Sequence, residues 1–417
     1  MIRRFMNIDY FNKIVTIIFI LCYTYQALYL FLPLFVRNKA RVINDKTNRY
    51  AILIAARNEE QVIGNLIDSL KNQNYPSDYV DIYVCADNCS DNTYDLVKKK
   101  GAIVYKRFNS VEVGKGYVLN YMLNKIKQTN RHYDAYLVFD ADNIVDKDFI
   151  KEINRVYNEG YQAVTSYRNS KNYGDNWISA GYGLWYLHES SHLNTSRMII
   201  NSSCAISGTG FLVSNELIEN NDGWNYFLLT EDIQFSVDSV LKDIKIGYAD
   251  KAVVYDEQPT SFKQSFNQRL RWSKGIIQVL NKYGLELIKK VIKGDFSSYD
   301  MLMNSAPAGI ISFISFVVNI AYILDRFLLN NSFIYLFSSL FNVFLGMYLI
   351  LFIISLLTTL KEWKNIYCAN LKKIVYIFTC PIFMLTYMPI TIVALFKKVE
   401  WTPIAHTRRL NLNQIRR

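Results

Sequence analysis

Proline, glycine and charge are scarce in this chain, and each scarcity excludes a class of protein. Only 7 of its 417 residues are Pro and 17 are Gly, which excludes a collagen-like or low-complexity chain. Charged residues make up 20% and aromatic residues 15%, a balance that excludes an intrinsically disordered chain. The 6 Cys are scattered, without the spacing of a metal site or a disulfide framework. The chain is long enough for two or three domains.

The apolar residues, 51% of the total, are concentrated in long uncharged blocks near the two ends. Ile14–Val36 carries no charge and exceeds the roughly 20 residues that a membrane-spanning helix needs. No small-residue cleavage site follows this block, so it predicts a retained anchor. Three further blocks are Ser305–Leu324, Phe327–Leu360 and Ile374–Phe396. The predicted organisation is an anchor (1–37), a soluble domain (38–260), amphipathic interfacial helices (261–302), a membrane bundle (303–396) and a tail (397–417).

The distribution of Lys and Arg predicts the orientation of these parts. More basic residues follow the first block than precede it, which predicts a cytoplasmic soluble domain in a multi-pass plasma-membrane protein. The basic tail also favours the cytoplasm, although three crossings after the soluble domain would place it outside. One block should therefore not cross, and Ile374–Phe396, which contains Pro381 and Pro389, is the first suspect. The alternative is that Phe327–Leu360 folds back on itself. The net charge of +11 is thus interpreted as a sign of topology and bilayer contact, with no nucleic-acid partner.

The soluble stretch alternates short apolar runs with helical patterns. Predicted strands are Tyr50–Ala56, Val80–Ala86, Ala102–Tyr105 and Ala135–Asp140, with helices expected over Glu59–Lys71, Asp91–Lys100, 114–127 and Asp146–Tyr157. This alternation predicts a doubly wound α/β sheet. Ligands of such sheets bind at the carboxyl ends of the strands, so the chemistry should lie directly after each apolar run.

Acidic residues do occur at those positions. Asp87 follows the second strand, and Asp140-Ala141-Asp142 ends the fourth, where two carboxylates would reach one divalent cation. Thr230-Glu231-Asp232 follows an aromatic run, and Gln268-Arg269-Leu270-Arg271-Trp272 lies in the amphipathic stretch Ser261–Leu287. Each motif alone also fits a plainer interpretation, such as a helix cap or an interfacial Arg–Trp pair.

Together and in this order, a strand-end Asp, a D-x-D, a T-E-D and a Q-x-x-R-W resemble the family-2 inverting glycosyltransferases. The resemblance is to the membrane-embedded synthases of cellulose, mixed-linkage β-glucan, chitin, hyaluronan and poly-N-acetylglucosamine. It covers about Tyr50 to Lys274. It implies a Rossmann-like nucleotide-diphospho-sugar transferase (GT-A) domain flanked by transmembrane helices.

The resemblance also implies roles for particular residues. UDP would be bound by residues after strands one, two and four and by the G-K-G and Q-x-x-R-W motifs: Ala55, Arg57, Glu59, Asp87, Lys115, Asp140, Gln268 and Arg271. Asp142, with Asp140, would hold Mg²⁺ or Mn²⁺. Asp232, flanked by Glu231 and Thr230, would be the general base that deprotonates the acceptor hydroxyl. A plain helix start is an equally good interpretation of Gly114-Lys115-Gly116.

The resemblance further implies which residues contact the acceptor and which residues of the tail act as a gate. Trp272 would form a platform under the acceptor sugar, and the turn Ser207-Gly208-Thr209 would line the acceptor end. The tail residues Trp401, Thr402 and His406 are similar in position to the gating segment of these synthases, although His406 stands where a basic residue is usual.

The expected activity is processive polymerisation of a β-linked polysaccharide from a UDP-sugar, with UDP-glucose favoured over UDP-N-acetylglucosamine. Expected partners are the growing polysaccharide, the bilayer and accessory secretion subunits. Transfer of one sugar to a membrane lipid is an alternative, and a basic membrane-tethered module without catalysis is another. His188-Glu189-Ser190-Ser191-His192 is a literal H-E-x-x-H, which leaves a zinc metalloprotease as a remote alternative.

Overall fold

The computed structural model describes residues 8–36, 46–305, 314–315, 317–322, 324, 333–404 and 406–416. Half of the predicted block Ser305–Leu324 lies outside these residues, as does the junction 37–45 between the predicted anchor and the soluble domain. The first part of the block Phe327–Leu360 also lies outside them.

The centre of the soluble domain is an eight-stranded mixed sheet in the order β3-β2-β1-β4-β7-β6-β8-β5. Its first four strands pair in parallel, and β7 is antiparallel to both of its neighbours. The strands are β1 (Tyr50–Ala56), β2 (Val80–Asp87), β3 (Ile103–Arg107), β4 (Ala135–Asp140), β5 (Ile144–Val145), β6 (Ala163–Ser170), β7 (Phe211–Ser214) and β8 (Ile246–Asp256). The four predicted strands are confirmed, whereas β5 to β8 were not predicted.

The helices run over the following residues, with short 3₁₀ (η1) and π-helical (η2) segments included. They are α1 (Ile8–Phe35), α2 (Ile63–Lys71), η1 (Ser77–Tyr79), α3 (Thr93–Lys99), α4 (Lys115–Lys127), α5 (Phe149–Tyr157), α6 (Trp177–His188), η2 (Glu189–Asn194), α7 (Thr195–Ile199), α8 (Asn215–Asn220), α9 (Glu231–Leu241), α10 (Phe262–Ile292), α11 (Phe296–Ser305), α13 (Phe333–Lys361), α14 (Asn370–Leu385), α15 (Tyr387–Phe396) and α16 (Leu412–Ile415).

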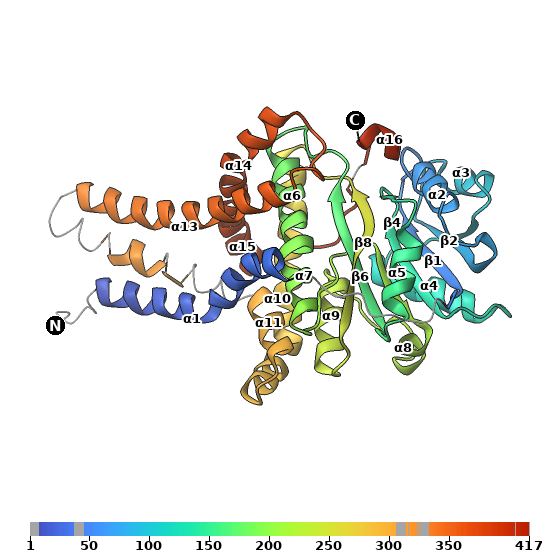
Figure 1. Ribbon diagram of the computed structural model, residues 1–417, viewed down its shortest axis with the longest axis horizontal. Coiled ribbons are helices and arrows are strands. Elements are labelled where there is room, and N and C mark those ends of the chain that lie inside the picture. The colour runs from blue at the N-terminus through green and yellow to red at the C-terminus, as the bar shows by residue number, and fades with distance from the viewer. Residues whose placement is uncertain are drawn as a thin grey trace.

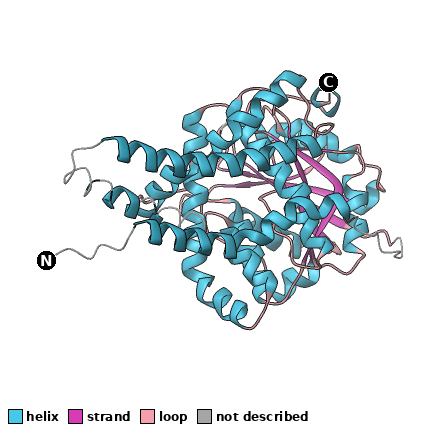
Figure 2. Ribbon diagram, turned by 60° about the vertical axis from the view of Figure 1, so that its left-hand side comes forward, coloured by secondary structure: helices cyan, strands magenta, loops and turns pink. Residues whose placement is uncertain are grey.

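Helices cover both faces of the sheet, as alternating side chains on the strands dictate. Ile52 and Ile54 of β1 pack with apolar residues of α2 and α5 on one face. Ala51 and Leu53 point to the other face, where α4, α6 and α9 supply the core. Figure 2 shows the strands confined to one part of the molecule, with helices alone forming the opposite end.

Two apolar helices, α1 and α13, project together away from the sheet (Figure 1). Within the part of the chain that the structure describes, three segments are long and apolar enough to cross a membrane: Tyr10–Phe35, Phe344–Lys361 and Asn370–Phe396. The third differs from the others because 39% of it is buried inside the protein, against 11% and 17%. Its helices α14 and α15 pack on α6 and α10.

Both flanks of the α14–α15 pair contact the soluble domain. Before it, the Asn169 side chain donates to the carbonyl of Asn365 (2.9 Å), and Lys372 near the start of α14 donates to the carbonyl of Gly174 (2.6 Å). After it, the tail returns to the soluble domain, where Arg408 pairs at 2.8 Å with Asp175 in the loop between β6 and α6. The segment therefore begins and ends on the same side of the molecule, with the C-terminal end beside the sheet (Figure 1).

Candidate active site

Lys115 joins three of the predicted motifs at the carboxyl edge of the parallel strands. Its Nζ lies 2.5 Å from Oδ1 of Asp140 and 2.6 Å from the carbonyl oxygen of Gly208. Burial lowers the pKa of Lys115, but the carboxylates of Asp140, Glu231 and Asp232 outweigh that effect and raise it. The G-K-G, D-x-D, S-G-T and T-E-D motifs, which are far apart in sequence, thus meet around one ammonium group.

Close packing requires glycine at position 116, which also lies at the start of a helix. A Cβ at this position would lie 2.0 Å from the carbonyl oxygen of Tyr226, a contact that backbone atoms cannot avoid without moving. The start of α4 therefore fits directly against the segment that leads into T-E-D. The plain helix start and the functional interpretation of G-K-G are compatible.

The two carboxylates of D-x-D differ in environment. Asp140 keeps 37% of its side chain exposed, whereas Asp142 is buried. Oδ2 of Asp142 accepts a hydrogen bond from the backbone N–H of Glu257 at 2.8 Å. Burial, and then the neighbouring carboxylate of Asp256, raise the pKa of Asp142 well above its usual range. Buried negative charge of this kind is costly unless a cation compensates it.

These residues fit a hard divalent cation. Mg²⁺ typically binds one or two carboxylates together with phosphate oxygens of a substrate. Among the described residues no group of three or more His, Cys, Asp or Glu side chains is arranged around a metal position, so the protein would supply Asp140 and Asp142 and a diphosphate the remaining oxygens.

The T-E-D motif begins helix α9. Burial and the adjacent Asp232 raise the pKa of Glu231 to about 7. Burial also raises the pKa of Asp232. Thr230 is buried against α10, where a Cβ at Gly275 would lie 2.5 Å from its side chain. A close approach of α10 to the T-E-D turn therefore requires glycine at position 275.

The turn Ser207-Gly208-Thr209, between α7 and β7, was predicted to line the acceptor, and it lies next to Asp232. A Cβ at Gly208 would be in van der Waals contact with Oδ2 of Asp232 (3.7 Å) and with Nη1 of Arg168 (3.8 Å), so this turn lies directly beside the T-E-D carboxylate. Thr209 is buried, and its hydroxyl accepts from the backbone N–H of Asp140 at 2.9 Å. Thr209 thus positions the D-x-D turn, and its contact with an acceptor stays a prediction.

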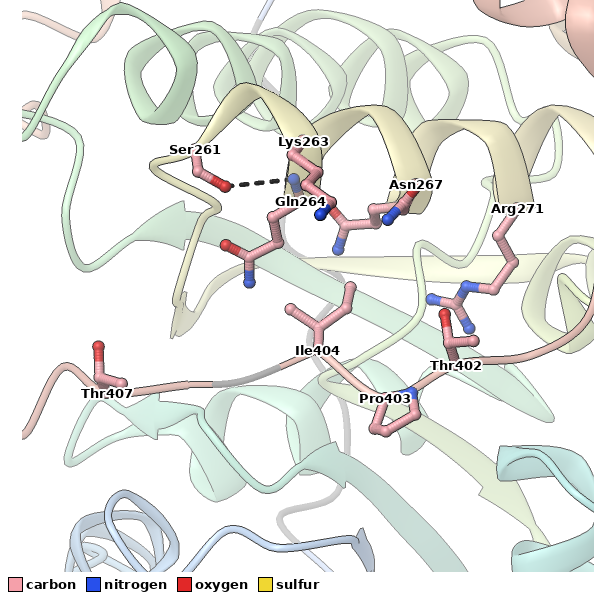
Figure 3. A pocket seen from close by; sticks show the side chains of 10 residues that line it. Ser261, Lys263, Gln264, Asn267, Arg271, Thr402, Pro403, Ile404 and Thr407 are labelled. Atoms are coloured by element: carbon pink, nitrogen blue, oxygen red, sulfur yellow. Dashed lines mark hydrogen bonds between the residues drawn. The ribbon is translucent and has the colours of Figure 1, made fainter.

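The Q-x-x-R-W motif lies on α10 and divides between two environments. Gln268 and Arg271 line a cavity of about 440 Å³ together with the tail residue Thr402. Figure 3 shows Arg271 extending from α10 toward the tail at Thr402. Trp272, the next residue, instead packs edge-on against Tyr182 of α6, with ring centroids 5.7 Å apart.

Arg269, inside the same motif, was not singled out from the sequence. It is fully buried, donates to Thr386 between α14 and α15 at 2.7 Å, and lies over the rings of Phe383 and Tyr387. It holds the α14–α15 pair against α10. An Arg inside an amphipathic helix gives no sequence signal of this burial.

Two tail residues that were predicted to act as a gate contact residues that were predicted to bind the nucleotide. The Arg57 guanidinium lies 5.3 Å from the centre of the Trp401 ring. Nδ1 of His406 lies 2.9 Å from Oε1 of Glu59. Burial lowers the pKa of His406, but Asp142 and Glu59 outweigh it and raise the pKa to about 10, so the ring is protonated near neutral pH.

Ala55 and Asp87, which were also predicted to bind the nucleotide, differ in their surroundings. Ala55 pairs in register with Asp140 across β1 and β4, so its half-buried methyl group borders the D-x-D. Asp87 is buried in an ion pair with Arg107 at 2.7 Å, a partner that the sequence did not indicate. The role of Asp87 toward a nucleotide stays a prediction.

The H-E-x-x-H segment does not form a zinc site in the structure. Its residues continue α6 into the π-helical segment η2, and Nδ1 of His192 contacts the carbonyl oxygen of Leu30 at 3.0 Å. Glu189 accepts from the Ser207 hydroxyl at 2.5 Å. No third ligand accompanies the two His among the described residues. The metalloprotease alternative is therefore not supported.

Comparison with known proteins agrees with this geometry. A family model described as glycosyltransferase like family 2 matches residues 48–275. A poly-beta-1,6-N-acetyl-D-glucosamine synthase of Staphylococcus epidermidis is 27% identical over 328 residues, 76% of each chain. A beta-monoglucosyldiacylglycerol synthase of Synechocystis sp. is 25% identical over 230 residues, 54% of this chain and 47% of that protein.

The chain spans about half the length of several curated relatives that it matches. Among solved structures, a mannosyltransferase of Pyrobaculum calidifontis in complex with GDP-Man and Mn²⁺ has a TM-score of 0.59 at 12% identity, covering 92% of this chain and 98% of that one. This likeness shows the fold alone. The predicted GT-A fold is confirmed.

Proposed function

Because this chain belongs to the glycosyltransferase-like family 2, we propose that it transfers a sugar from a UDP-sugar, with inversion, to an acceptor at a membrane surface. The observation that supports this most directly is the convergence on Lys115. A cation that binds Asp140 and the Gly208 carbonyl, beside Glu231 and Asp232, lies where a diphosphate, a donor sugar and an acceptor hydroxyl would meet.

In the proposed reaction Asp232 takes the proton of the acceptor hydroxyl as its oxygen attacks the anomeric carbon. A single displacement converts an α-linked UDP-sugar into a β-glycoside. Lys115 and Arg271 stabilise the negative charge that develops on the leaving UDP, with Gln268 beside Arg271 in the same cavity. Mg²⁺ or Mn²⁺ at Asp140 and Asp142 would neutralise further diphosphate charge.

For the product we propose a β-linked polysaccharide. The polysaccharide synthase relative aligns with 76% of this chain, which extends the similarity beyond the 48–275 domain. The prediction of a β-glucan from UDP-glucose gains no support from these relatives, whereas a poly-N-acetylglucosamine product does. Accessory secretion subunits stay a prediction.

A second candidate is transfer of a single sugar to a membrane lipid. It is favoured by the similarity to beta-monoglucosyldiacylglycerol synthases of 25–27% identity over 54–61% of this chain. The two candidates share donor chemistry and differ in the acceptor.

We also propose a topology in which the Asn370–Phe396 segment lies at the membrane surface and does not cross. Contacts of Asn365 before it, of Lys372 in its first turn and of Arg408 after it all reach the catalytic domain. The other two candidate spans project together from that domain (Figure 1). This arrangement keeps the basic tail beside the catalytic domain, on the cytoplasmic side that the charge bias favours.

The proposed activity is tested with purified protein in detergent, a panel of UDP-sugars and Mg²⁺ or Mn²⁺. We expect UDP release from one UDP-sugar, loss of that release with EDTA, and a product that a β-specific glycanase digests. Release of UDP from none of the sugars would contradict the proposal. A product that consists of a single sugar on a lipid would select the second candidate.

A further inference from the structure

Glu189 is a carboxylate at the active site to which no role has been given so far. It opens the π-helical segment η2, and a π-helical turn inside a helix is often associated with a functional site. Its Oε1 accepts from the Ser207 hydroxyl at 2.5 Å, and the side chain is only partly exposed. Burial raises its pKa, while the Ser207 hydrogen bond and the charges of Arg197 and Arg168 oppose the rise and Asp232 adds to it.

Glu189 and Asp232 lie on two sides of one turn. Three charged side chains hold this turn: Glu189 binds the Ser207 hydroxyl, Arg168 Nη1 donates to the Ser207 carbonyl at 2.5 Å, and Lys115 donates to the Gly208 carbonyl. The Cβ position of Gly208 lies 3.7 Å from Oδ2 of Asp232, so the turn and the proposed base are neighbours. An acceptor that places a hydroxyl at Asp232 would therefore lie beside this turn.

Part of the Glu189 carboxylate is left for a ligand. Its second oxygen, Oε2, has no hydrogen-bond partner in the described part of the chain, while the residue keeps some exposed surface. Arg168 does not neutralise it fully, because its Nε and Nη2 both bind Asp256. A carboxylate oxygen in such a place favours a ligand that donates a hydrogen bond.

The same segment receives the N-terminal helix. Nδ1 of His192 contacts the carbonyl of Leu30, and the Ser196 hydroxyl donates to the carbonyl of Tyr29 at 3.0 Å. Glu189 thus lies on the chain segment that links the site of Asp232 to the place where α1 packs. An acceptor arriving from the membrane side would meet it close to the reacting hydroxyl.

We propose that Glu189 accepts a hydrogen bond from a second hydroxyl of the acceptor, beside the hydroxyl that Asp232 deprotonates, and thereby selects an acceptor that ends in a sugar. A sugar end carries several neighbouring hydroxyls. Diacylglycerol has one, which the reaction consumes, so it would offer Oε2 of Glu189 no hydrogen-bond donor. This inference rests on the proposed function and specifies its acceptor.

The test compares Glu189→Gln with wild type and with Glu216→Gln, an exposed residue of α8 that serves as the matched control. UDP release is measured against the concentration of β-linked oligosaccharides of glucose or N-acetylglucosamine, and against diacylglycerol dispersed in detergent. Release without any acceptor, the KM for the donor and the thermal unfolding midpoint are recorded for each variant.

We expect one of the oligosaccharides to stimulate the wild type and Glu189→Gln to raise its KM roughly 5- to 30-fold, the difference between a charged and a neutral hydrogen bond. The acceptor KM should rise by a larger factor than the donor KM and than the loss of acceptor-free release, whereas Glu216→Gln should leave all three at wild-type values. An unchanged acceptor KM, an equal loss of acceptor-free release, or stimulation by diacylglycerol and by no oligosaccharide would overturn the inference. Wild type that releases no UDP from any donor would instead refute the proposed function.

Discussion

Gly275 on α10 lies where the Q-x-x-R-W helix touches the T-E-D turn, so Gly275→Ala tests whether this contact positions the base. The added methyl group would lie 2.5 Å from the side chain of Thr230 and 2.9 Å from its backbone nitrogen. Because the backbone nitrogen is not the end of a flexible side chain, either α10 or the turn must move. Asp232 is two residues from Thr230 and would move with it.

The magnitude follows from three terms. Ala in place of Gly inside a helix gains about 1 kcal/mol, and overpacking of a filled contact costs about 1–3 kcal/mol. The net loss of unfolding free energy is therefore about 0–2 kcal/mol. A displacement of about 1 Å at a reacting group costs on the order of 100-fold in rate. We expect kcat for UDP release to fall by roughly 10- to 100-fold while the protein still folds.

The assay measures UDP release and the thermal unfolding midpoint for Gly275→Ala and for Gly284→Ala. Gly284 lies in the same helix, and a Cβ there has no neighbour within 4 Å. The control should retain wild-type turnover and gain slightly in stability. Full turnover in Gly275→Ala would show that the T-E-D turn does not depend on this contact, and would refute the reasoning.

Three further predictions concern the tail, the acid–base pair and the buried network under α1. Trp401→Ala should raise the donor KM by roughly 2- to 30-fold, because a cation–π contact worth about 0.5–2 kcal/mol no longer holds Arg57. Lys398→Ala, which changes an exposed residue of the same tail, should leave the donor KM unchanged. Equal donor KM values in the two variants would contradict the role of this contact. Turnover should fall as pH drops below about 7, because the base works deprotonated and the Glu231–Asp232 pair takes up its first proton there. Glu231→Gln removes a negative neighbour of Asp232 and should shift this fall in turnover to lower pH. A pH–rate profile that is flat from pH 8 to pH 5 would refute the assignment of the base. Arg197→Met leaves the buried Asp300 carboxylate unpaired and should lower the free energy of unfolding by about 3–5 kcal/mol in denaturant or thermal unfolding, whereas Arg197→Met/Asp300→Leu should recover part of that loss.

The parallel half of the sheet was predictable from the sequence because β1, β2 and β4 are short, apolar and largely buried on both faces. β1 and β4 have the predicted bounds. Strands β5 to β8 were not predictable from the sequence, because β6 carries polar residues such as Arg168 and Asn169 and β5 has only two residues. Their pairing depends on contacts between distant segments, which no local pattern reveals.

The site was predictable where motifs supply it, and less so where partners come from elsewhere. The structure brings Asp140, Lys115 and Asp232 together, and their roles in catalysis stay predictions. Glu189 drew attention only through a metal motif that the fold does not use, because its partner Ser207 is 18 residues away. Arg269 looked like any interfacial Arg, and its burial depends on α14 and α15.

The most direct test of the account is UDP release by Asp232→Asn, with Asp238→Asn on the same helix α9 as control and with UDP binding measured separately by calorimetry. The account predicts that Asp232→Asn binds UDP like the wild type but releases none from the UDP-sugar that the wild type uses, while Asp238→Asn stays active. Undiminished release of UDP by Asp232→Asn would contradict the assignment of the base and, with it, the proposed mechanism.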